Sequence, residues 1–348
     1  MQRVLFISPT WMDIYKDIMG ELEKQGYEVD FIADKSFQED PYKVWGKKTN
    51  KCFLRTQREN FFRRKDIYWE AILETPQYNH NYDYLFVVDG QSVSPMLFST
   101  VKDRNPKVKC INYLFDTTKG VYEFNRNFQY FDKIFTFDFG ESKKYNVEFL
   151  PIYWVETDTV KEYEFDLFGL GQYSKPRYEL FEFLDNISKR EGLKSYIKLQ
   201  LDARKNFRQY KIKYAIRRML GLANKIIPPQ AFLSELCTNT KIPPIEFRQY
   251  ICKSMCVIDT SPSHQDGLTA RFMWALGAGR KIITTNKLVK EYDFYSPKQI
   301  YVVDSIADLN NDCQKLISFI KAEYSMPNDI KEIISKYRID NWIGHLFC

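Results

Sequence analysis

Long apolar runs are missing from this sequence of 348 residues. None approaches the ~20 residues that a transmembrane helix needs, so a membrane-spanning protein is not expected. Histidine is scarce, with three residues, and the seven cysteines are scattered without a CxxC pair or metal-ligand spacing. These absences argue against zinc modules and disulfide scaffolds, and they favour free thiols in a reducing, cytoplasmic setting. The short apolar run in MQRVLFISP is typical of a first β-strand rather than of a signal peptide.

Apolar residues suitable for packed interiors are plentiful. Hydrophobic residues make up 44% of the chain and aromatic residues 16%, which argues against disorder. A chain of this length exceeds one ordinary hydrophobic core and favours two domains. The net charge of +6 is modest, so the distribution of the charges carries more information than their sum.

Short buried strands alternate with helical stretches in the first part of the chain. This alternation predicts a parallel sheet covered by helices on both faces. The expected strands cover Val4–Ile7, Val29–Ala33, Tyr84–Val88, Lys109–Tyr113 and Lys133–Phe137, and an expected helix covers Asp13–Lys24.

The alternation breaks around Leu150–Lys161, which indicates a linker, and then resumes. The sequence therefore predicts two doubly wound α/β domains in tandem. In the second domain the expected strands are Tyr163–Leu170, Ser195–Leu199, Met255–Asp259, Lys281–Thr285 and Ile300–Val303, and the expected helices are Lys175–Lys189, Ile245–Lys253, Ile306–Glu323 and Tyr337–Phe347.

The stretch Ser261–Asn286 combines a polar loop, a helix start and a glycine-rich turn between two buried strands. The unpaired N–H groups at such a helix start favour an anion, and Gly267 permits close approach of a ligand to the backbone. Arg271 can hold a phosphate with two parallel hydrogen bonds. The polar residues expected around this helix start are His264, Gln265, Asp266, Thr269 and Arg271. The alternative is an ordinary βαβ unit whose glycines serve turns and packing.

Aspartates follow two of the buried strands in the first domain. Asp89 ends the strand Tyr84–Val88, and Asp116 follows the strand Lys109–Tyr113. A desolvated carboxylate at such a position can act as a general base. Alternatively, both aspartates cap helices, a frequent role of this residue.

Residues 203–225 carry eight basic residues and no acidic one. Aromatic and aliphatic residues are interleaved with these charges, and a solvated helix face normally mixes both signs. The pattern indicates either a basic amphipathic helix on an anionic membrane surface or a basic helix packed on its own domain. No nucleic-acid-binding module accompanies the basic residues, so nucleic acid is not an expected partner.

Four stretches together resemble a bacterial family of glycosyltransferases for capsule and lipopolysaccharide, related to the CgeB-like spore-maturation group. They are YDYLFVVDG (Tyr82–Gly90), YLFDT (Tyr113–Thr117), FDKIFTFD (Phe131–Asp138) and GLTARFMWALGAGRKIITTN (Gly267–Asn286). The resemblance implies the GT-B fold, in which two Rossmann-like domains face each other across a cleft. It implies an acceptor domain at 1–155, a nucleotide-sugar donor domain at 160–330, and a C-terminal helix at 331–348 that returns to the first domain.

The resemblance also implies a donor site in the second domain. Arg271 becomes the candidate for the donor diphosphate. The other residues assigned to the donor are His264, Gln265, Gly267, Leu268, Thr269 and Gly169. Many GT-B enzymes carry an acidic residue for the donor ribose where this sequence has Trp274, and an aromatic side chain cannot replace a carboxylate as an acceptor.

No metal is expected in this site. An Asp-x-Asp pair would hold a divalent ion, but the nearest pattern, Glu156-Thr157-Asp158, falls in the linker. The charge of the leaving group would then be neutralised by Arg271 and the helix dipole, with Arg280 or Lys281 as further candidates. Asp116 is preferred over Asp89 as the base.

The expected function is transfer of a sugar from a nucleotide sugar to a cell-surface glycan, free or lipid-linked, by a cytoplasmic enzyme that can be peripheral on the inner face of the plasma membrane. One alternative is a CDP-polyol phosphotransferase, which would favour further histidines beside His264. Another is a non-catalytic GT-B-like module that binds glycan or nucleotide, and Trp274 keeps this alternative open.

Overall fold

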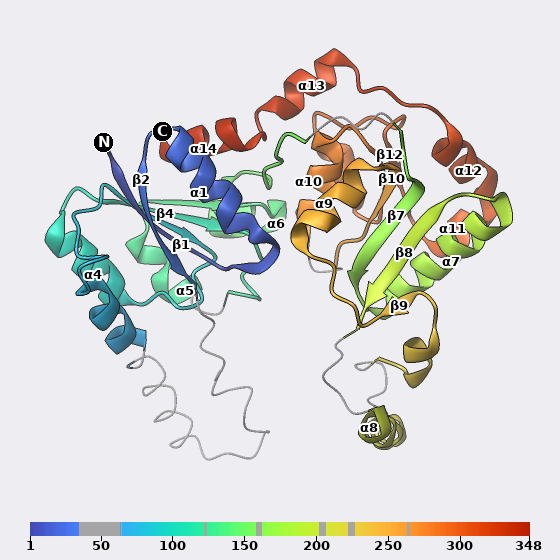
Figure 1. Ribbon diagram of the computed structural model, residues 1–348, viewed down its shortest axis with the longest axis horizontal. Helices are drawn as coiled ribbons and strands as arrows, with labels where there is room; N and C mark the ends of the chain where they lie inside the picture. The colour runs from blue at the N-terminus through green and yellow to red at the C-terminus, as the bar shows by residue number, and fades with distance from the viewer. Residues whose placement is uncertain are drawn as a thin grey trace. The chain divides into compact units, whose positions relative to one another are not determined.

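The structure is a computed structural model that describes residues 1–34, 63, 65–121, 124–157, 162–201, 207–221, 227–262 and 265–348. The predicted site residue His264 and the linker residue Asp158 lie outside the described residues. The chain divides into two compact units (Figure 1). Unit 1 comprises Met1–Ile152 and Ile339–Cys348, and unit 2 comprises Tyr153–Arg338.

Unit 1 is built on a parallel sheet with the strand order β2-β1-β3-β4-β5-β6. The order reverses between β1 and β3, so the carboxyl ends of these two strands flank a topological switch point. The strands are β1 (Arg3–Ser8), β2 (Glu28–Ala33), β3 (Tyr84–Val88), β4 (Lys109–Leu114), β5 (Lys133–Thr136) and β6 (Glu148–Phe149).

Helices cover both faces of this sheet, because successive strand residues point to opposite faces. On one face Leu5 and Leu85 pack with Trp69 and Leu97; on the other, Phe6 stacks on Phe86 with ring centroids 5.3 Å apart. The helices of unit 1 are α1 (Ile14–Lys24), an unlabelled helix at 65–73, α4 (Pro95–Arg104), α5 (Phe124–Asn127), α6 (Phe139–Tyr145) and α14 (Ile339–Phe347).

The C-terminal helix α14 packs on unit 1 and contacts α1. Trp342 is fully buried, and its Nε1 donates to the carbonyl of Pro151 at 3.1 Å. The Phe347 ring meets the Tyr84 ring edge to face at 4.9 Å. Burial of each such side chain stabilises a protein by about 1.5–3 kcal/mol. The prediction that the C-terminal helix returns to the first domain is therefore confirmed.

Unit 2 is built on a second parallel sheet with the order β12-β11-β10-β7-β8-β9. Its order reverses between β7 and β10, which places the switch point of this sheet there. The strands are β7 (Phe165–Gln172), β8 (Ser195–Gln200), β9 (Cys237–Thr238), β10 (Ser254–Asp259), β11 (Lys281–Thr284) and β12 (Ile300–Val302).

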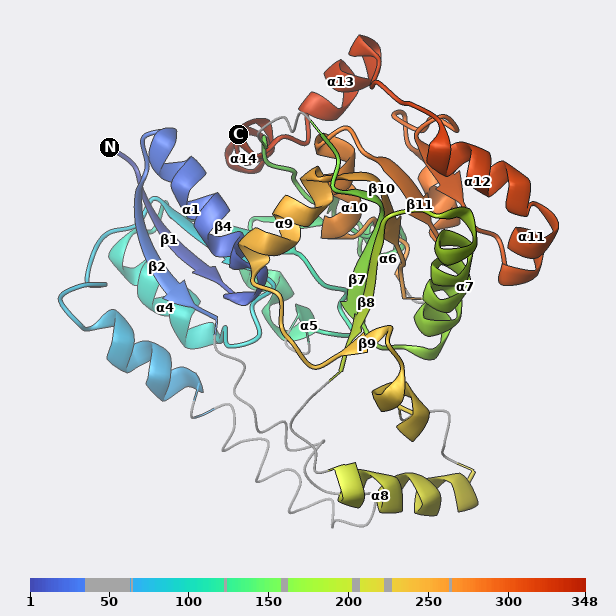
Figure 2. The same ribbon diagram turned by 45° about the vertical axis from the view of Figure 1, so that its right-hand side comes forward.

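The helices of unit 2 also cover both faces of its sheet. Helices α7 (Lys175–Glu191) and α12 (Cys313–Lys321) share one core cluster with Leu167. On the other side of β7, the ring of Phe168 packs on Phe247 from α9 (Pro244–Cys252). Figure 2 shows α9 and α7 on opposite sides of β7 and β8. The remaining helices are α8 (Phe207–Met219), α10 (Ala270–Gly277), α11 (Ile306–Asn311) and α13 (Asn328–Ser335).

One predicted helix is wrong in its extent. The expected helix Ile306–Glu323 is two helices, because Asp312 leaves the helical conformation with φ −104° and ψ 22°. The break follows Asn310 and Asn311, and Asn and Asp side chains favour caps over helix interiors. The predicted class, two parallel α/β sheets covered by helices, is confirmed. None of the helices in the described part of the chain has the length and apolar character needed to traverse a bilayer.

Candidate functional site

The switch point of the unit 2 sheet is bridged by one arginine. Arg177 lies in the first turn of α7 and donates from Nη1 to the carbonyl of Gln172, at the end of β7. Its Nε donates to the hydroxyl of Thr260, which follows β10, at 2.5 Å. Ligands of open α/β sheets bind beyond the carboxyl ends of the strands at such a point. Arg177 therefore fixes the two strand ends where a ligand is expected.

Asp259, the last residue of β10, organises the same edge. It is fully buried, and its Oδ1 accepts from the hydroxyl of Thr269 at 2.6 Å. Its Oδ2 accepts from the hydroxyl of Thr284 at 3.2 Å. Thr269 also caps α10, because its hydroxyl accepts from the backbone N–H of Phe272. The helix start is thereby fastened to two neighbouring strand ends.

Arg271 lies beside Asp259, and only some of its N–H groups have hydrogen-bond partners in the described part of the chain. Its Nη1 lies 3.6 Å from Asp259 Oδ1 and donates to the carbonyl of Ile258 at 3.3 Å. Burial lowers the pKa of Arg271, and the nearby Asp259 carboxylate opposes this shift. The Nε of Arg271 is buried and has no hydrogen-bond partner among the described residues, and the same holds for Oγ of Ser261. Two polar atoms that a ligand could satisfy thus lie at this strand edge.

The sequence did not identify Arg177 as a site residue. Burial and, to a lesser extent, the positive charge of Arg271 together lower the pKa of Arg177 to about 10. The two guanidinium groups therefore lie close enough to interact, and they belong to one site. The available signal in the sequence was the glycine at position 171. In the structure a Cβ at Gly171 would lie 3.2 Å from the guanidinium carbon of Arg177. Glycine at the strand end makes room for the arginine.

The loop before α10 is held by Asn286 at the end of β11. Its Nδ2 donates to the carbonyls of Asp266 and Gly267 at 3.0 and 3.2 Å. Gln265 donates from Nε2 to the carbonyl of Gly267 as well, at 3.1 Å. Leu268 is buried, with 1% exposure, so its side chain serves packing. The structure thus brings Gln265, Gly267, Leu268, Thr269 and Arg271 to one strand edge.

Gly169 lies inside β7, within the expected strand Tyr163–Leu170. It is buried, and a Cβ there would meet Cδ1 of Ile258 at 2.9 Å and the Phe181 ring at 3.2 Å. Its position is explained by close packing of α7 and β10 against β7. Contact of Gly169 with a donor stays a prediction.

Arg280 and Lys281 lie at the opposite edge of the sheet, so their expected role in neutralising the leaving group is wrong. Lys281 is the first residue of β11 and Arg280 directly precedes it, at the amino edge of the parallel sheet. The Lys281 ammonium group donates to the carbonyls of Phe319 and Ile320 at 2.7 Å each, and also to that of Ala322. Lys281 therefore caps the end of α12.

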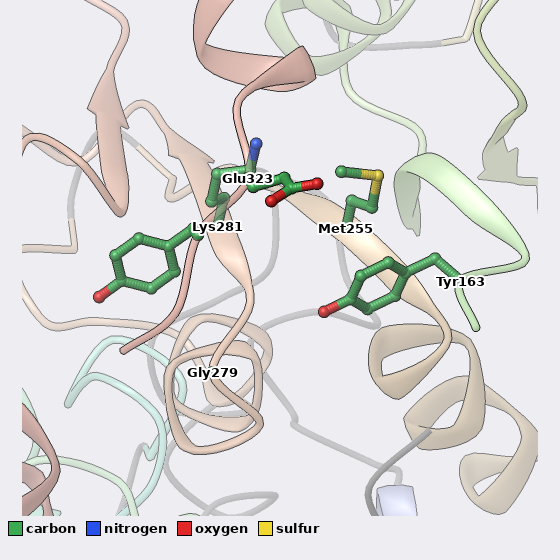
Figure 3. Close-up of a pocket in the computed structure, with 6 residues that line it drawn as sticks. Tyr163, Met255, Gly279, Lys281 and Glu323 are labelled. Carbon is green, nitrogen blue, oxygen red and sulfur yellow. The ribbon is translucent and has the colours of Figure 1, made fainter. Parts of the chain in front are cut away.

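A pocket of about 410 Å³ lies at this amino edge (Figure 3). In Figure 3 the Glu323 carboxylate points towards Met255. The guanidinium group of Arg280 stacks on Tyr163, 4.9 Å from the ring centroid. The lining residues are Tyr163, Met255, Gly279, Lys281, Glu323 and Tyr324.

Trp274 is buried in unit 2, where it packs between α10 and α9. Its exposed fraction is 5%, and the guanidinium carbon of Arg248 lies 4.3 Å from its ring centroid. The Phe247 ring is 6.1 Å away. Trp274 therefore belongs to the interface between the two helices, and no carboxylate occupies its position.

In unit 1, Asp89 is an unusual residue at the end of β3. It adopts a left-handed conformation with φ 59°. Its Oδ1 accepts from the backbone N–H groups of Phe115 and Asp116 at 2.7 and 3.0 Å. Burial raises the pKa of Asp89 to about 7, although these two hydrogen bonds oppose the shift. Asp89 therefore ties the loop after β4 to the end of β3.

Asp116 lies in that loop and is exposed. Its Oδ1 accepts from the backbone N–H of Thr117 at 2.7 Å. The loop closes tightly on the carboxylate, because a Cβ at Gly120 would lie 2.4 Å from Asp116 Oδ2. The two predicted base candidates thus lie together at the ends of adjacent strands. Asp116 is exposed to solvent and Asp89 is buried.

Among the described residues, no group of three or more His, Cys, Asp or Glu side chains is arranged to hold a metal ion. Glu156, at the start of the acidic triplet, is exposed.

Three solved structures share this architecture along the whole chain. An alpha,alpha-trehalose-phosphate synthase (UDP-forming) from Burkholderia vietnamiensis is 10% identical with a TM-score of 0.58, and the match covers 100% of this chain and 99% of that one. The alpha,alpha-trehalose 6-phosphate synthase from Burkholderia multivorans is also 10% identical with a TM-score of 0.58, and the match covers 100% of this chain and 98% of that one. An alpha-glucosyltransferase in complex with UDP and DNA is 13% identical with a TM-score of 0.53, over 100% and 95%.

These matches show the fold, which is that of GT-B glycosyltransferases. No protein-family model and no curated protein matches the sequence. The resemblance to the capsule, lipopolysaccharide and CgeB-like group stays a prediction.

Proposed function

We propose that this protein is a glycosyltransferase that moves a sugar from a nucleotide-sugar donor to a cell-surface glycan. The observation that carries the proposal is the arginine pair at the switch point of the unit 2 sheet. Arg177 and Arg271 place two cations against one carboxylate, Asp259. An excess of partly buried positive charge beside a helix start suits a diphosphate.

In this proposal residues 160–330 bind the donor and residues 1–155 bind the acceptor. The diphosphate lies between the arginine pair and the N-terminus of α10, and it satisfies the Nε of Arg271. As the bond from the sugar to the diphosphate breaks, negative charge grows on the leaving group. Fixed guanidinium groups at a partly desolvated site stabilise that charge without reorganisation. The loop at 265–269 contacts the sugar or the phosphates.

We assign the role of general base to Asp116. The hydroxyl proton of the acceptor passes to its carboxylate while the hydroxyl oxygen bonds to the donor sugar. Its exposure allows an acceptor to approach. Asp89 is assigned the role of holding the Asp116 loop, because its own carboxylate oxygen already accepts two backbone N–H groups.

The nucleotide is tested first with UDP, because UDP is named for the trehalose-phosphate synthase and glucosyltransferase neighbours. A thermal-shift screen would compare UDP-, GDP-, CMP-, CDP- and dTDP-linked compounds. A ligand at ~100 times its dissociation constant adds about 2.7 kcal/mol to the unfolding free energy. Stabilisation by CDP-polyols alone would favour the phosphotransferase, and binding without turnover on any glycan acceptor would favour a non-catalytic module.

The two aspartates are separated by their amide variants. We expect Asp116→Asn to abolish turnover while nucleotide binding is retained. We expect Asp89→Asn to retain most of the activity, because an amide oxygen can still accept both N–H groups. The reverse result would assign the base to Asp89. The acceptor class, capsule or lipopolysaccharide, rests on the four sequence stretches and is tested with purified glycans of each type.

A further inference from the structure

The helix α8 (Phe207–Met219) exposes an apolar face. It lies in the segment that connects β8 to β9 and contacts the 3-10 helix at Pro229–Leu233. Four exposed apolar side chains follow at intervals of four, three and one residues, which places them on one side of a helix. They are Ile212, Ile216, Met219 and Leu220, and Met219 is 83% exposed.

The opposite side of α8 behaves differently. Tyr214 projects there and is half-buried, whereas the four apolar side chains are each more than half exposed. A helix packed on its own domain through its apolar face would bury that face. The four apolar side chains are exposed instead, so packing on unit 2 does not account for this apolar face.

Basic residues border the apolar face on both sides. At ~100° per residue, Arg217 lies on one side of it and Lys211 and Arg218 on the other. All three are exposed. The complete segment 203–225 has eight basic residues and no acidic one. An apolar face flanked by cations complements a surface that has anionic groups above an apolar layer.

We propose that α8 is a docking surface for an anionic lipid bilayer, and this proposal is independent of the proposed catalytic activity. The helix lies in the plane of the headgroups, with its apolar face inserted shallowly and the arginines at the phosphates. Its 13 residues span about 20 Å along the axis, and their exposed cations exclude a spanning orientation. A second copy of this chain would need only the apolar face, and nucleic acid would need only the basic residues. A lipid bilayer with anionic headgroups matches both.

The test is flotation of the full-length protein with vesicles of phosphatidylcholine alone or mixed with phosphatidylglycerol. We expect binding to the anionic vesicles only, and loss of binding as salt shortens the Debye length from about 10 Å at 0.1 M to about 3 Å at 1 M. Each cation near the surface contributes about fivefold to partitioning. Arg217→Glu with Arg218→Glu should therefore reduce binding at least about 25-fold.

The apolar contribution is tested by Met219→Ser with Leu220→Ser. The matched control is Ile245→Ser, which removes a similarly exposed side chain from α9. Loss of binding in the first variant and not in the control supports the proposal. Equal loss in both, equal binding to neutral vesicles, or no flotation at low salt would overturn it. Dimerisation that Met219→Ser abolishes, without vesicle binding, would assign the face to a second copy.

Discussion

Arg177 and Arg271 reach the same strand edge from two different helices, and each donates to a backbone carbonyl beside Asp259. Arg177 donates to the carbonyl of Thr260 at 3.4 Å, and Arg271 donates to that of Ile258 at 3.3 Å. Burial lowers the pKa of Arg177, and repulsion from the like charge of Arg271 adds to this shift. A bound dianionic group would relieve that repulsion. The arrangement therefore favours binding of an anion.

The first prediction concerns nucleotide affinity. We expect Arg271→Ala to weaken binding of a nucleoside diphosphate by on the order of 2–3 kcal/mol, about 30- to 150-fold, because a charge-assisted contact is lost from a buried site. Isothermal calorimetry measures this directly. Affinity for the matching nucleoside monophosphate should fall less.

The matched control is Arg280→Ala, which removes an arginine from the amino edge of the same sheet. It should leave nucleotide affinity unchanged while Arg177→Ala lowers it. Equal effects of Arg271→Ala and Arg280→Ala would show that the arginines act only through the stability of unit 2.

Alternation of strands and helices was sufficient to predict the fold, because the spacing of apolar residues shows which side of each helix or strand is buried. The short edge strands β6 (Glu148–Phe149) and β9 (Cys237–Thr238) were not predicted, since two residues have no periodicity. The helix start at Thr269 and the position of Arg271 followed from local spacing. Contacts between segments distant in the sequence were harder to predict.

Arg177 shows why the site was incomplete. It is separated from Thr260 by 83 positions, and only the strand order brings the two together. Lys281 shows the opposite error. Its closeness in sequence to Arg271 suggested that both residues belong to one site. The chain runs along α10 between them, so Lys281 lies at the other end of the sheet. A residue's position along its strand, at the amino or the carboxyl end, decides which site it can join.

The second prediction concerns Asp89. Its pKa of about 7 lies above its ordinary value of 3.8, so ionising this group costs folding free energy. Its contribution to stability is complete below about pH 4, declines as the pH rises towards 7, and is constant above that. We expect Asp89→Asn to remove this decline, which amounts to at most about 4 kcal/mol. Asparagine also tolerates the left-handed conformation.

The measurement is the unfolding free energy from urea titrations at about pH 4.5, where most of the contribution of Asp89 is present, and at about pH 8, where it is lost. Asp89→Ala provides the contrast, because it leaves two backbone N–H groups without their acceptor and should destabilise at both pH values. Equal pH dependence in the wild type and Asp89→Asn would contradict the assigned shift.

The third prediction is that turnover persists in excess EDTA. It follows from the sequence, which has no Asp-x-Asp pair after a buried strand, and from the arginine pair as the alternative source of positive charge. Initial rates are compared with and without chelator after dialysis. A loss of activity that only manganese or magnesium restores would refute it and would require a metal in the donor site.

The last prediction distinguishes packing from ligand contact at Gly169. A Cβ at this position would approach Cδ1 of Ile258 to 2.9 Å, closer than packed atoms allow. We expect Gly169→Ala to lower the unfolding free energy by about 1–3 kcal/mol. Ile258→Val removes the clashing methyl group, so the double variant should regain about 1 kcal/mol, although Ile258→Val alone destabilises by about 0.5–1.5 kcal/mol. Nucleotide affinity of the double variant should equal that of the wild type. If Gly169→Ala instead keeps full stability and loses nucleotide affinity, the glycine contacts the donor and the packing account is wrong.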